Sequence, residues 1–309
     1  MSRIAFVFPG QGSQTVGMGK DLYEKFDLAK DIYSLADEIM GMPLSTISFE
    51  GPADLLMQTH ITQPALFVHS YILLQLIGNN IKADATAGHS LGEYTSNVYA
   101  NTIGFEDGLR LVKRRGELMK ESGVKRPGTM AALIGLNEKQ IDDICAEAKE
   151  NQIVQPANYN APGQIVISGD VDAVHRAMKI AKEEPYKSKL VKELPVSGAF
   201  HSELMLTSAE ELRIAIDKVN FRNADIPIFT NVEAEPVEDK NILKNSLYRQ
   251  LMSSVKWMQT INNMSKDFDV TKYYEIGSGK VLTGLIKRID PKAELHNIGT
   301  TEDLLNYKI

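Results

Sequence analysis

The heptapeptide Ala87-Gly88-His89-Ser90-Leu91-Gly92-Glu93 contains the pattern Gly-x-Ser-x-Gly. In this pattern a strand turns sharply into a helix and exposes the serine hydroxyl, because the two glycines leave room for the neighbouring backbone. Residues 83–87 before it can form a short buried strand, and residues 93–99 after it can begin a helix. The sequence therefore predicts Ser90 as a nucleophile near the positive end of a helix dipole. For the pentapeptide alone, an ordinary capping serine in a glycine-rich turn is the alternative.

The composition limits the class of protein. The 309 residues allow one large domain or two unequal ones. With 43% hydrophobic and 24% charged residues the chain has the balance of a soluble globular protein, and its net charge of −6 argues against general nucleic-acid binding. Cys145 is the single cysteine, so no internal disulfide can form, as fits a reducing cytoplasm. The apolar run at residues 4–8 is too short for a signal peptide, and no stretch could span a bilayer. We therefore expect a soluble cytoplasmic protein that binds neither nucleic acid nor membranes.

Two glycine-rich loops resemble phosphate-binding motifs, but each lacks residues that its motif requires. Residues 4–8 predict a first buried strand that runs into the loop 9–14, but Thr15 stands where Gly-x-Gly-x-x-Gly needs its third glycine. The loop 277–280 lacks the first glycine and the final Ser/Thr of a P-loop. Ligands still bind at the carboxyl ends of strands in open α/β sheets, so Gln11 is a candidate site residue. On these residues alone, a plain turn glutamine is favoured.

The predicted elements in the middle of the chain are shorter and follow a different order from those on either side. Residues 127–197 predict the order βαββαβ, in which Asn137 caps the first helix, and this order is typical of a compact ferredoxin-like unit. Longer helices and buried strands resume on either side of it. We therefore expect an α/β fold with two subdomains and a cleft between them. The large one, residues 1–126 and 198–309, is α/β-hydrolase-like with a parallel sheet, and the small one, residues 127–197, is inserted into it.

Further elements are expected along the large subdomain. Helices are predicted over residues 21–40, over 105–122, and from residue 61 onward with Thr62 as N-cap, and the charged cluster at residues 113–117 is expected to form a solvated face. Later segments predict one strand, one helix and a second strand, over residues 225–231, 247–259 and 273–277.

One of the six histidines lies where a general base could reach a serine. His201 stands in a loop of small residues between a predicted strand and a predicted helix that runs to residue 217. A neutral imidazole, with an ordinary pKa of about 6.5, suits the base that a serine nucleophile requires. A histidine that caps the following helix is an equal alternative. His60, His69 and His89 are interpreted as structural, and no residues are spaced for a metal site.

Taken together, these motifs resemble the malonyl-CoA:acyl carrier protein transacylases, including the free-standing acyltransferases of fatty acid and polyketide synthesis. The resemblance covers nearly the whole chain and depends on seven segments in order. These are Phe8-Pro9-Gly10-Gln11-Gly12-Ser13-Gln14, Ile61-Thr62-Gln63-Pro64-Ala65, Gly88-His89-Ser90-Leu91-Gly92-Glu93-Tyr94, Arg115-Gly116-Glu117-Leu118-Met119, Asn160-Ala161-Pro162-Gly163-Gln164, Gly198-Ala199-Phe200-His201-Ser202 and Glu275-Ile276-Gly277-Ser278-Gly279-Lys280. The family's usual proline after Glu-x-Gly is Ser278 here, which is a minor departure.

The resemblance implies an activity and its catalytic residues. Ser90 would attack the thioester carbonyl of malonyl-CoA while His201 takes its proton. The histidine would be oriented by a backbone carbonyl, at the position of Gln250, and not by an aspartate. The backbone N–H of Leu91 and the Gln11 loop would form the oxyanion hole. The malonyl-enzyme would then await the phosphopantetheine thiol of an acyl carrier protein, without any metal or cofactor.

The resemblance also implies residues that select the acyl group. Arg115 would bind the free carboxylate of the malonyl group, because an unpaired charge in a partly dry pocket is strongly unfavourable. Phe200 would crowd an α-methyl branch and so favour malonyl over methylmalonyl. Gln63, Asn160 and Met119 would shape the remaining substrate pocket.

Two other functions remain open from the sequence. An acyl hydrolase or esterase could use the same serine and histidine, although it would gain nothing from a buried Arg115. A non-catalytic module that binds carrier proteins is the other alternative. We expect a monomer whose acidic carrier protein docks on basic residues. The candidates for that surface are Lys113, Arg114, Lys125, Arg126, Lys187, Lys189, Lys280, Lys287 and Arg288.

Overall fold

A computed structural model describes residues 2–196 and 198–307. Its larger sheet has six strands in the order β10-β9-β1-β2-β7-β8, and all neighbours are parallel except β7 and β8. The strands are β1 (Arg3–Phe8), β2 (Ala85–Gly88), β7 (Ile228–Phe229), β8 (Pro236–Val237), β9 (Val270–Ile276) and β10 (Glu294–Ile298). Central strands of such a sheet are buried on both faces, which is why β1 and β2 consist almost entirely of apolar and small residues.

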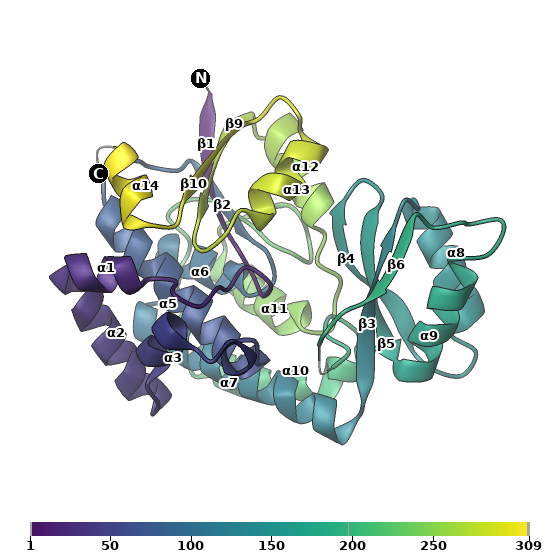
Figure 1. Cartoon of the computed structure of the whole chain (residues 1–309). Helices are drawn as coiled ribbons and strands as arrows, with labels where there is room; N and C mark the ends of the chain where they lie inside the picture. Colours follow the sequence, from purple (N-terminus) through teal and green to yellow (C-terminus); the bar gives the residue numbers. More distant parts are fainter. Residues whose placement is uncertain (1, 197, 308–309) are drawn as a thin grey trace.

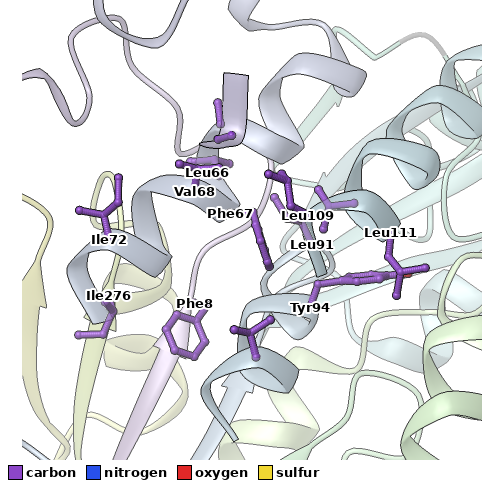
Figure 2. Packing of buried hydrophobic residues seen from close by; sticks show 14 of the residues in the cluster. Phe8, Leu66, Phe67, Val68, Ile72, Leu91, Tyr94, Leu109, Leu111 and Ile276 are labelled. Atoms are coloured by element: carbon purple, nitrogen blue, oxygen red, sulfur yellow. The ribbon is translucent and has the colours of Figure 1, made fainter. Parts of the chain in front are cut away.

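Helices cover both faces of this sheet (Figure 1). Those before the small sheet are α1 (Lys20–Lys25), α2 (Asp27–Met40), α3 (Leu44–Glu50), α4 (Ala53–Leu56), α5 (Thr59–Ile77), α6 (Gly92–Tyr99) and α7 (Phe105–Lys125). Those after it are the short 3-10 helix Glu203–Met205, α10 (Leu206–Asp217), α11 (Lys240–Gln250), α12 (Trp257–Lys266), α13 (Val281–Ile289) and α14 (Thr301–Asn306). The main core lies between α5, α6, α7 and the sheet, where Phe8, Phe67 and Tyr94 are fully buried (Figure 2).

The second sheet is antiparallel and forms a separate layer beside the first (Figure 1). Its strands are β3 (Gly128–Ile134), β4 (Val154–Ala161), β5 (Gln164–Asp170) and β6 (Leu190–Glu193), in the order β4-β5-β3-β6. Helices α8 (Glu138–Ala148) and α9 (Val171–Ile180) pack on one of its faces around a core of their own. The chain order is βαββαβ, and the predicted α/β fold with an inserted ferredoxin-like unit is confirmed. Asn137 caps α8 as expected, with Gln140 completing the capping box.

Several predicted elements are wrong in detail. The helix expected over residues 247–259 is two helices, α11 and α12, with a non-helical segment at residues 251–256 between them. Thr62 is not an N-cap, since α5 begins at Thr59 and the Thr62 hydroxyl donates to the carbonyl of Leu56 at 2.5 Å. The strand expected over residues 225–231 is two residues long, because β7 pairs with β2 only at Ile228 and Phe229. In the described part of the chain, no helix is long and apolar enough to cross a membrane.

Candidate active site

Ser90 lies on the turn between β2 and α6, with φ at +51°. The turn is tight enough to require glycine on both sides. A Cβ on Gly92 would lie 2.1 Å from the carbonyl oxygen of Phe8, and one on Gly88 would lie 1.9 Å from the carbonyl carbon of Gly92. The close approach of β1, β2 and α6 therefore explains the Gly-x-Ser-x-Gly pattern and raises the serine at the carboxyl edge of the parallel sheet.

His201 is the partner of Ser90. Its Nε2 lies 2.8 Å from Ser90 Oγ, and its Nδ1 lies 2.9 Å from the backbone oxygen of Gln250. Since the Gln250 carbonyl can only accept, the proton of a neutral ring is on Nδ1 and Nε2 is free to accept the serine proton. Burial, and then the positive charge of Arg115, lower the pKa of His201 to about 3. The imidazole is therefore neutral at physiological pH. Ser197, in the same predicted loop, lies outside the described residues.

Arg115 projects into the site from α7 and is 1% exposed. Its Nη2 donates to Ser90 Oγ at 2.9 Å and to the side-chain oxygen of Gln250 at 3.0 Å, while Nη1 donates to Gln63 Oε1 at 2.5 Å. Its guanidinium carbon lies 5.6 Å from the centre of the Tyr94 ring. The solvated face expected for residues 113–117 is therefore wrong at Arg115. This residue lies three positions after buried Val112, on the apolar stripe of the helix.

A cavity of about 120 Å³ opens over these groups, several times the ~30 Å³ that one water occupies in the liquid. Its lining residues are Gln11, Gln63, His89, Ser90, Leu91, Arg115, Met119, Met130, Asn158, Leu194, Val196, Phe200 and His201. Most of its walls are apolar, and its charged side chain is Arg115. The pocket therefore suits a small acyl group that carries a negative charge.

Not every predicted pocket residue lines this cavity. Asn160 lies beside it, with its Oδ1 2.8 Å from Nε2 of His89, whose ring also contacts Trp257 edge-on. Asn158, two residues earlier on β4, lines the cavity in its place. Asn158 was not predicted from the sequence, and the register of β4 shifts on either side of it, between Pro156 and Asn158 and between Tyr159 and Ala161, so simple alternation along the strand does not reveal its position.

Two backbone donors face the site from different loops. Among the described residues, no backbone or side-chain acceptor takes the N–H of Leu91 or the N–H of Gln11. The Gln11 side chain donates to Thr59 Oγ1 at 3.2 Å, which fixes the loop after β1 against α5. Unoccupied N–H groups beside a nucleophile are the donors that a developing oxyanion needs.

A second cavity, of about 390 Å³, adjoins the first and shares Gln11 and Val196 with it. Met57, Lys120 and Val124 are among its other lining residues, so it lies between the loop before α5, the end of α7 and the segment after β6. The two cavities together give a longer substituent a path from the surface to Ser90.

Among the described residues, no side-chain cluster suits a metal, and a carboxylate takes the place of an anion in the P-loop-like segment. No cluster of three or more His, Cys, Asp or Glu side chains that could hold a metal occurs in the residues described. The first N–H groups of α13, at Leu282 and Thr283, donate to the Glu275 carboxylate at 3.0 and 2.7 Å. Glu275 thus occupies the position that a bound phosphate would take in a P-loop.

Residues 5–277 match the family described as "Acyl transferase domain". The chain belongs to the acyl transferase family. It is 42% identical over 308 residues to the malonyl CoA-acyl carrier protein transacylase of Bacillus subtilis, covering 98% of this chain and 96% of that protein. The transacylase of the same name from Staphylococcus aureus is 39% identical, with 99% of each chain covered.

Solved structures of acyl transferases have the same fold. The acyl carrier protein S-malonyltransferase of Vibrio cholerae superposes with a TM-score of 0.94 at 39% identity, covering 99% of each chain. A malonyl-transacylase solved in complex with a type II polyketide synthase acyl-carrier protein gives a TM-score of 0.93 at 35% identity, also over 99% of each chain.

Proposed function

We propose that this acyl transferase moves the malonyl group from malonyl-CoA to the phosphopantetheine thiol of an acyl carrier protein, through a malonyl-serine intermediate. The reaction is that of an [acyl-carrier-protein] S-malonyltransferase and serves fatty acid or polyketide synthesis. The observation that carries the proposal is the buried Arg115 guanidinium, 2.9 Å from the hydroxyl of a serine that is itself 2.8 Å from a neutral histidine. A nucleophile and base beside a fixed cation match an acyl group with a free carboxylate.

The first half-reaction follows from these distances. Ser90 Oγ attacks the thioester carbonyl carbon as its proton passes to His201 Nε2, and the carbonyl electron pair moves onto oxygen. The N–H groups of Leu91 and Gln11 receive this oxyanion. Collapse breaks the carbon–sulfur bond, and His201 returns the proton to the departing CoA sulfur. The malonyl ester remains on Ser90.

In the second half-reaction a thiol is the nucleophile and Ser90 is the leaving group. The phosphopantetheine thiol gives its proton to His201 and attacks the malonyl-serine ester, and collapse returns the proton to Ser90. Both thioesters carry the same pantetheine arm, which the cavity of about 390 Å³ is placed to admit. Because CoA leaves before the carrier protein arrives, the kinetics are ping-pong. A thioester is already activated, so neither half-reaction calls for a cofactor.

Three residues tune the acyl pocket in this proposal. Gln63 and Met119 hold the far side of the Arg115 guanidinium, since Gln63 accepts from Nη1 and donates to the Met119 sulfur at 3.1 Å. Phe200, 4% exposed in the cavity wall, crowds the α-carbon and favours malonyl over methylmalonyl groups. Competition between the two CoA thioesters tests this role, and equal use of both would reject it.

Arg115 is tested by replacement with alanine. Loss of one partner from a buried ion pair costs about 3–5 kcal/mol, so Arg115→Ala is expected to lower kcat/KM for malonyl-CoA at least ~100-fold while sparing acetyl-CoA. Initial rates with both thioesters check this, and an equal loss with each would reject the role. A parallel assay measures the free malonate released from malonyl-CoA when no carrier protein is present. The alternative acyl hydrolase would release it, because water would be its acceptor.

The partner and setting complete the proposal. Lys189, Lys280, Lys287 and Arg288 form no ion pair within the described residues, whereas Arg114 is paired with Glu211 at 2.7 Å. We assign the acidic carrier protein to the first four. The expected monomer stays part of the proposal, and the single buried cysteine fits the cytoplasm.

A further inference from the structure

The backbone of Ser90 is fixed by two side chains from distant parts of the chain. Asn231, just after β7, accepts the Ser90 N–H at 2.7 Å through Oδ1, and Gln250, at the end of α11, donates from Nε2 to the Ser90 carbonyl at 2.9 Å. A non-glycine residue with φ near +51° is strained and persists only when its surroundings hold it there. Asn231 and Gln250 supply that restraint.

Both of these residues are connected to Glu93, three residues after the nucleophile, Asn231 through its backbone and Gln250 through its side chain. Glu93 Oε2 accepts the backbone N–H of Asn231 at 3.0 Å and Nε2 of Gln250 at 2.8 Å. The side chain is completely buried at the start of α6, and the reaction described above makes no use of it. A buried carboxyl group at this position needs an explanation, because burying it is costly.

The contacts with Glu93 and with the Ser90 carbonyl together fix which way the Gln250 amide points. A carboxylate oxygen can only accept, so the NH₂ group of Gln250 must face Glu93 and the amide oxygen must face the opposite way. That oxygen accepts Arg115 Nη2 at 3.0 Å, and the backbone oxygen of the same residue accepts His201 Nδ1 at 2.9 Å. An inverted amide would turn its NH₂ group against the guanidinium.

We propose that Glu93 is a positioning residue for malonyl transfer, which acts through Gln250 and Asn231 to fix Ser90 and to orient Arg115. This inference rests on the proposed function, because the carboxylate that Arg115 is proposed to bind is that of the malonyl group.

An acceptor oxygen, and not the negative charge, is what this role requires. One oxygen of Glu93 takes both hydrogen bonds, while Oε1 has no partner among the described residues. Burial raises the pKa of Glu93 to about 7, although the hydrogen bonds from Gln250 and Asn231 lower it; Glu233 adds to the rise and Arg115 of α7 opposes it. Glutamine can present the same acceptor oxygen to both donors. Methionine has a similar length and offers no oxygen, only a weakly accepting sulfur.

The test compares Glu93→Met with Glu93→Gln and with wild type. For Glu93→Met, kcat/KM for malonyl-CoA is expected to fall about 10- to 100-fold, because two buried donors lose their acceptor. Acetyl-CoA should lose less, since it does not use Arg115. Glu93→Gln should stay within about 3-fold of wild type. Rates are divided by the number of active sites, counted by complete labelling with a fluorophosphonate that reacts with the serine.

A matched control separates positioning from folding. Glu275 is also a buried glutamate of the large subdomain, and its oxygens cap α13 away from Ser90. Glu275→Met should lower the melting temperature and leave the malonyl-to-acetyl ratio unchanged. Equal losses for the two thioesters in Glu93→Met, or a Glu93→Gln variant as impaired as Glu93→Met, would overturn the proposal. If wild type transfers no malonyl group, the proposed function fails, and the rate of fluorophosphonate labelling still tests Glu93 on Ser90.

A measurement on the unaltered chain covers the case in which Glu93→Met does not fold. The side-chain amide protons of Gln250 should exchange with solvent about 100-fold more slowly than those of exposed Gln75. If the Gln250 amide protons exchange as fast as those of Gln75, the Gln250 amide is not hydrogen-bonded to Glu93 and the proposal is wrong.

Discussion

The two reacting side chains belong to residues with left-handed backbones. Ser90 has φ at +51° and His201 has φ at +59°, and each such conformation costs about 1–3 kcal/mol in a non-glycine residue. Hydrogen bonds offset the cost: the His201 N–H donates to the carbonyl of Leu251 at 3.1 Å, next to the Gln250 carbonyl that receives its ring. These backbone conformations direct both side chains into the cavity, where Ser90 Oγ and His201 Nε2 are already at hydrogen-bond distance.

The pKa of His201 predicts an unusual acid limb for acylation. A base must be neutral to accept a proton, and His201 stays neutral down to a pH of about 3, against 6.5 for a free imidazole. A lowered histidine pKa also stabilises the fold above pH 6.5, and that stability is lost as the pH falls from 6.5 toward 3. Short-time acylation of Ser90 by malonyl-CoA should therefore persist at pH 5 in molecules that remain folded. Half-loss near pH 6.5 with the fold intact would contradict it.

At the residue level, the sequence indicated the proposed nucleophile and base better than the residues that hold them in place. Ser90 was predicted from its pentapeptide, and His201 from its loop once the family resemblance decided between two alternatives. The Gln250 side chain, Asn231 and Glu93 were not predicted as site residues, because their roles depend on contacts between segments as far apart as residues 93 and 250. No local pattern reports such contacts.

Among the elements, the turn from β2 into α6 allows the least change. Gly92 packs against the backbone of β1 and Gly88 against that of α6, while the N-cap Leu91 supplies its N–H and the first turn of the helix supplies Glu93. The α7 helix contributes Arg115 from a face that its flanking charges had concealed. Charged positions at 113, 114 and 117 suggested exposure, whereas the helical period placed residue 115 with Val112 and Met119.

A pair of glycine-to-alanine changes tests the turn. In Gly92→Ala the new methyl would meet the Phe8 carbonyl oxygen at 2.1 Å, so β1 or α6 must shift, and we expect several kcal/mol of lost stability together with loss of Ser90 acylation. Gly284→Ala is the matched control, since Gly284 is also helical and its Cβ would meet nothing within 4 Å. It should gain about 1 kcal/mol with normal acylation. Urea unfolding of both variants checks this, and a Gly92→Ala variant as stable as wild type would contradict it.

Across the whole molecule, the small antiparallel sheet is placed beside the carboxyl edge of the large parallel one (Figure 1). Asn158, Leu194 and Val196 bring it into the wall of the catalytic cavity, and Val255 pairs with Asn158 where the two parts meet. The sequence predicted strands of both sheets, the large one from apolar runs such as residues 4–8 and the small one from the element order of residues 127–197. It did not predict the break between α11 and α12, because the segment 251–256 is stabilised by contacts with β4 and the His201 loop and not by its own propensity.

The docking surface proposed for the carrier protein includes residues of both subdomains. Lys287 and Arg288 lie on α13 of the large subdomain, and Lys189 lies just before β6 of the small one. Lys189 and Arg288 line one surface hollow together with Pro162. The double charge reversal Lys189→Glu with Lys287→Glu should raise KM for the carrier protein about 10-fold at low salt, and less at high salt, with KM for malonyl-CoA unchanged. Lys30→Glu on α2 serves as the control. Equal values for wild type and the double variant would discard this docking surface.

The covalent step can be observed directly. Wild type is mixed with malonyl-CoA alone, quenched in acid, digested and analysed by mass spectrometry, before and after addition of a holo acyl carrier protein. The account predicts one malonyl group on the peptide that contains Ser90, and its transfer to the phosphopantetheine thiol when the carrier is added. Malonyl transfer to the carrier without any acyl group ever appearing on Ser90 would contradict it.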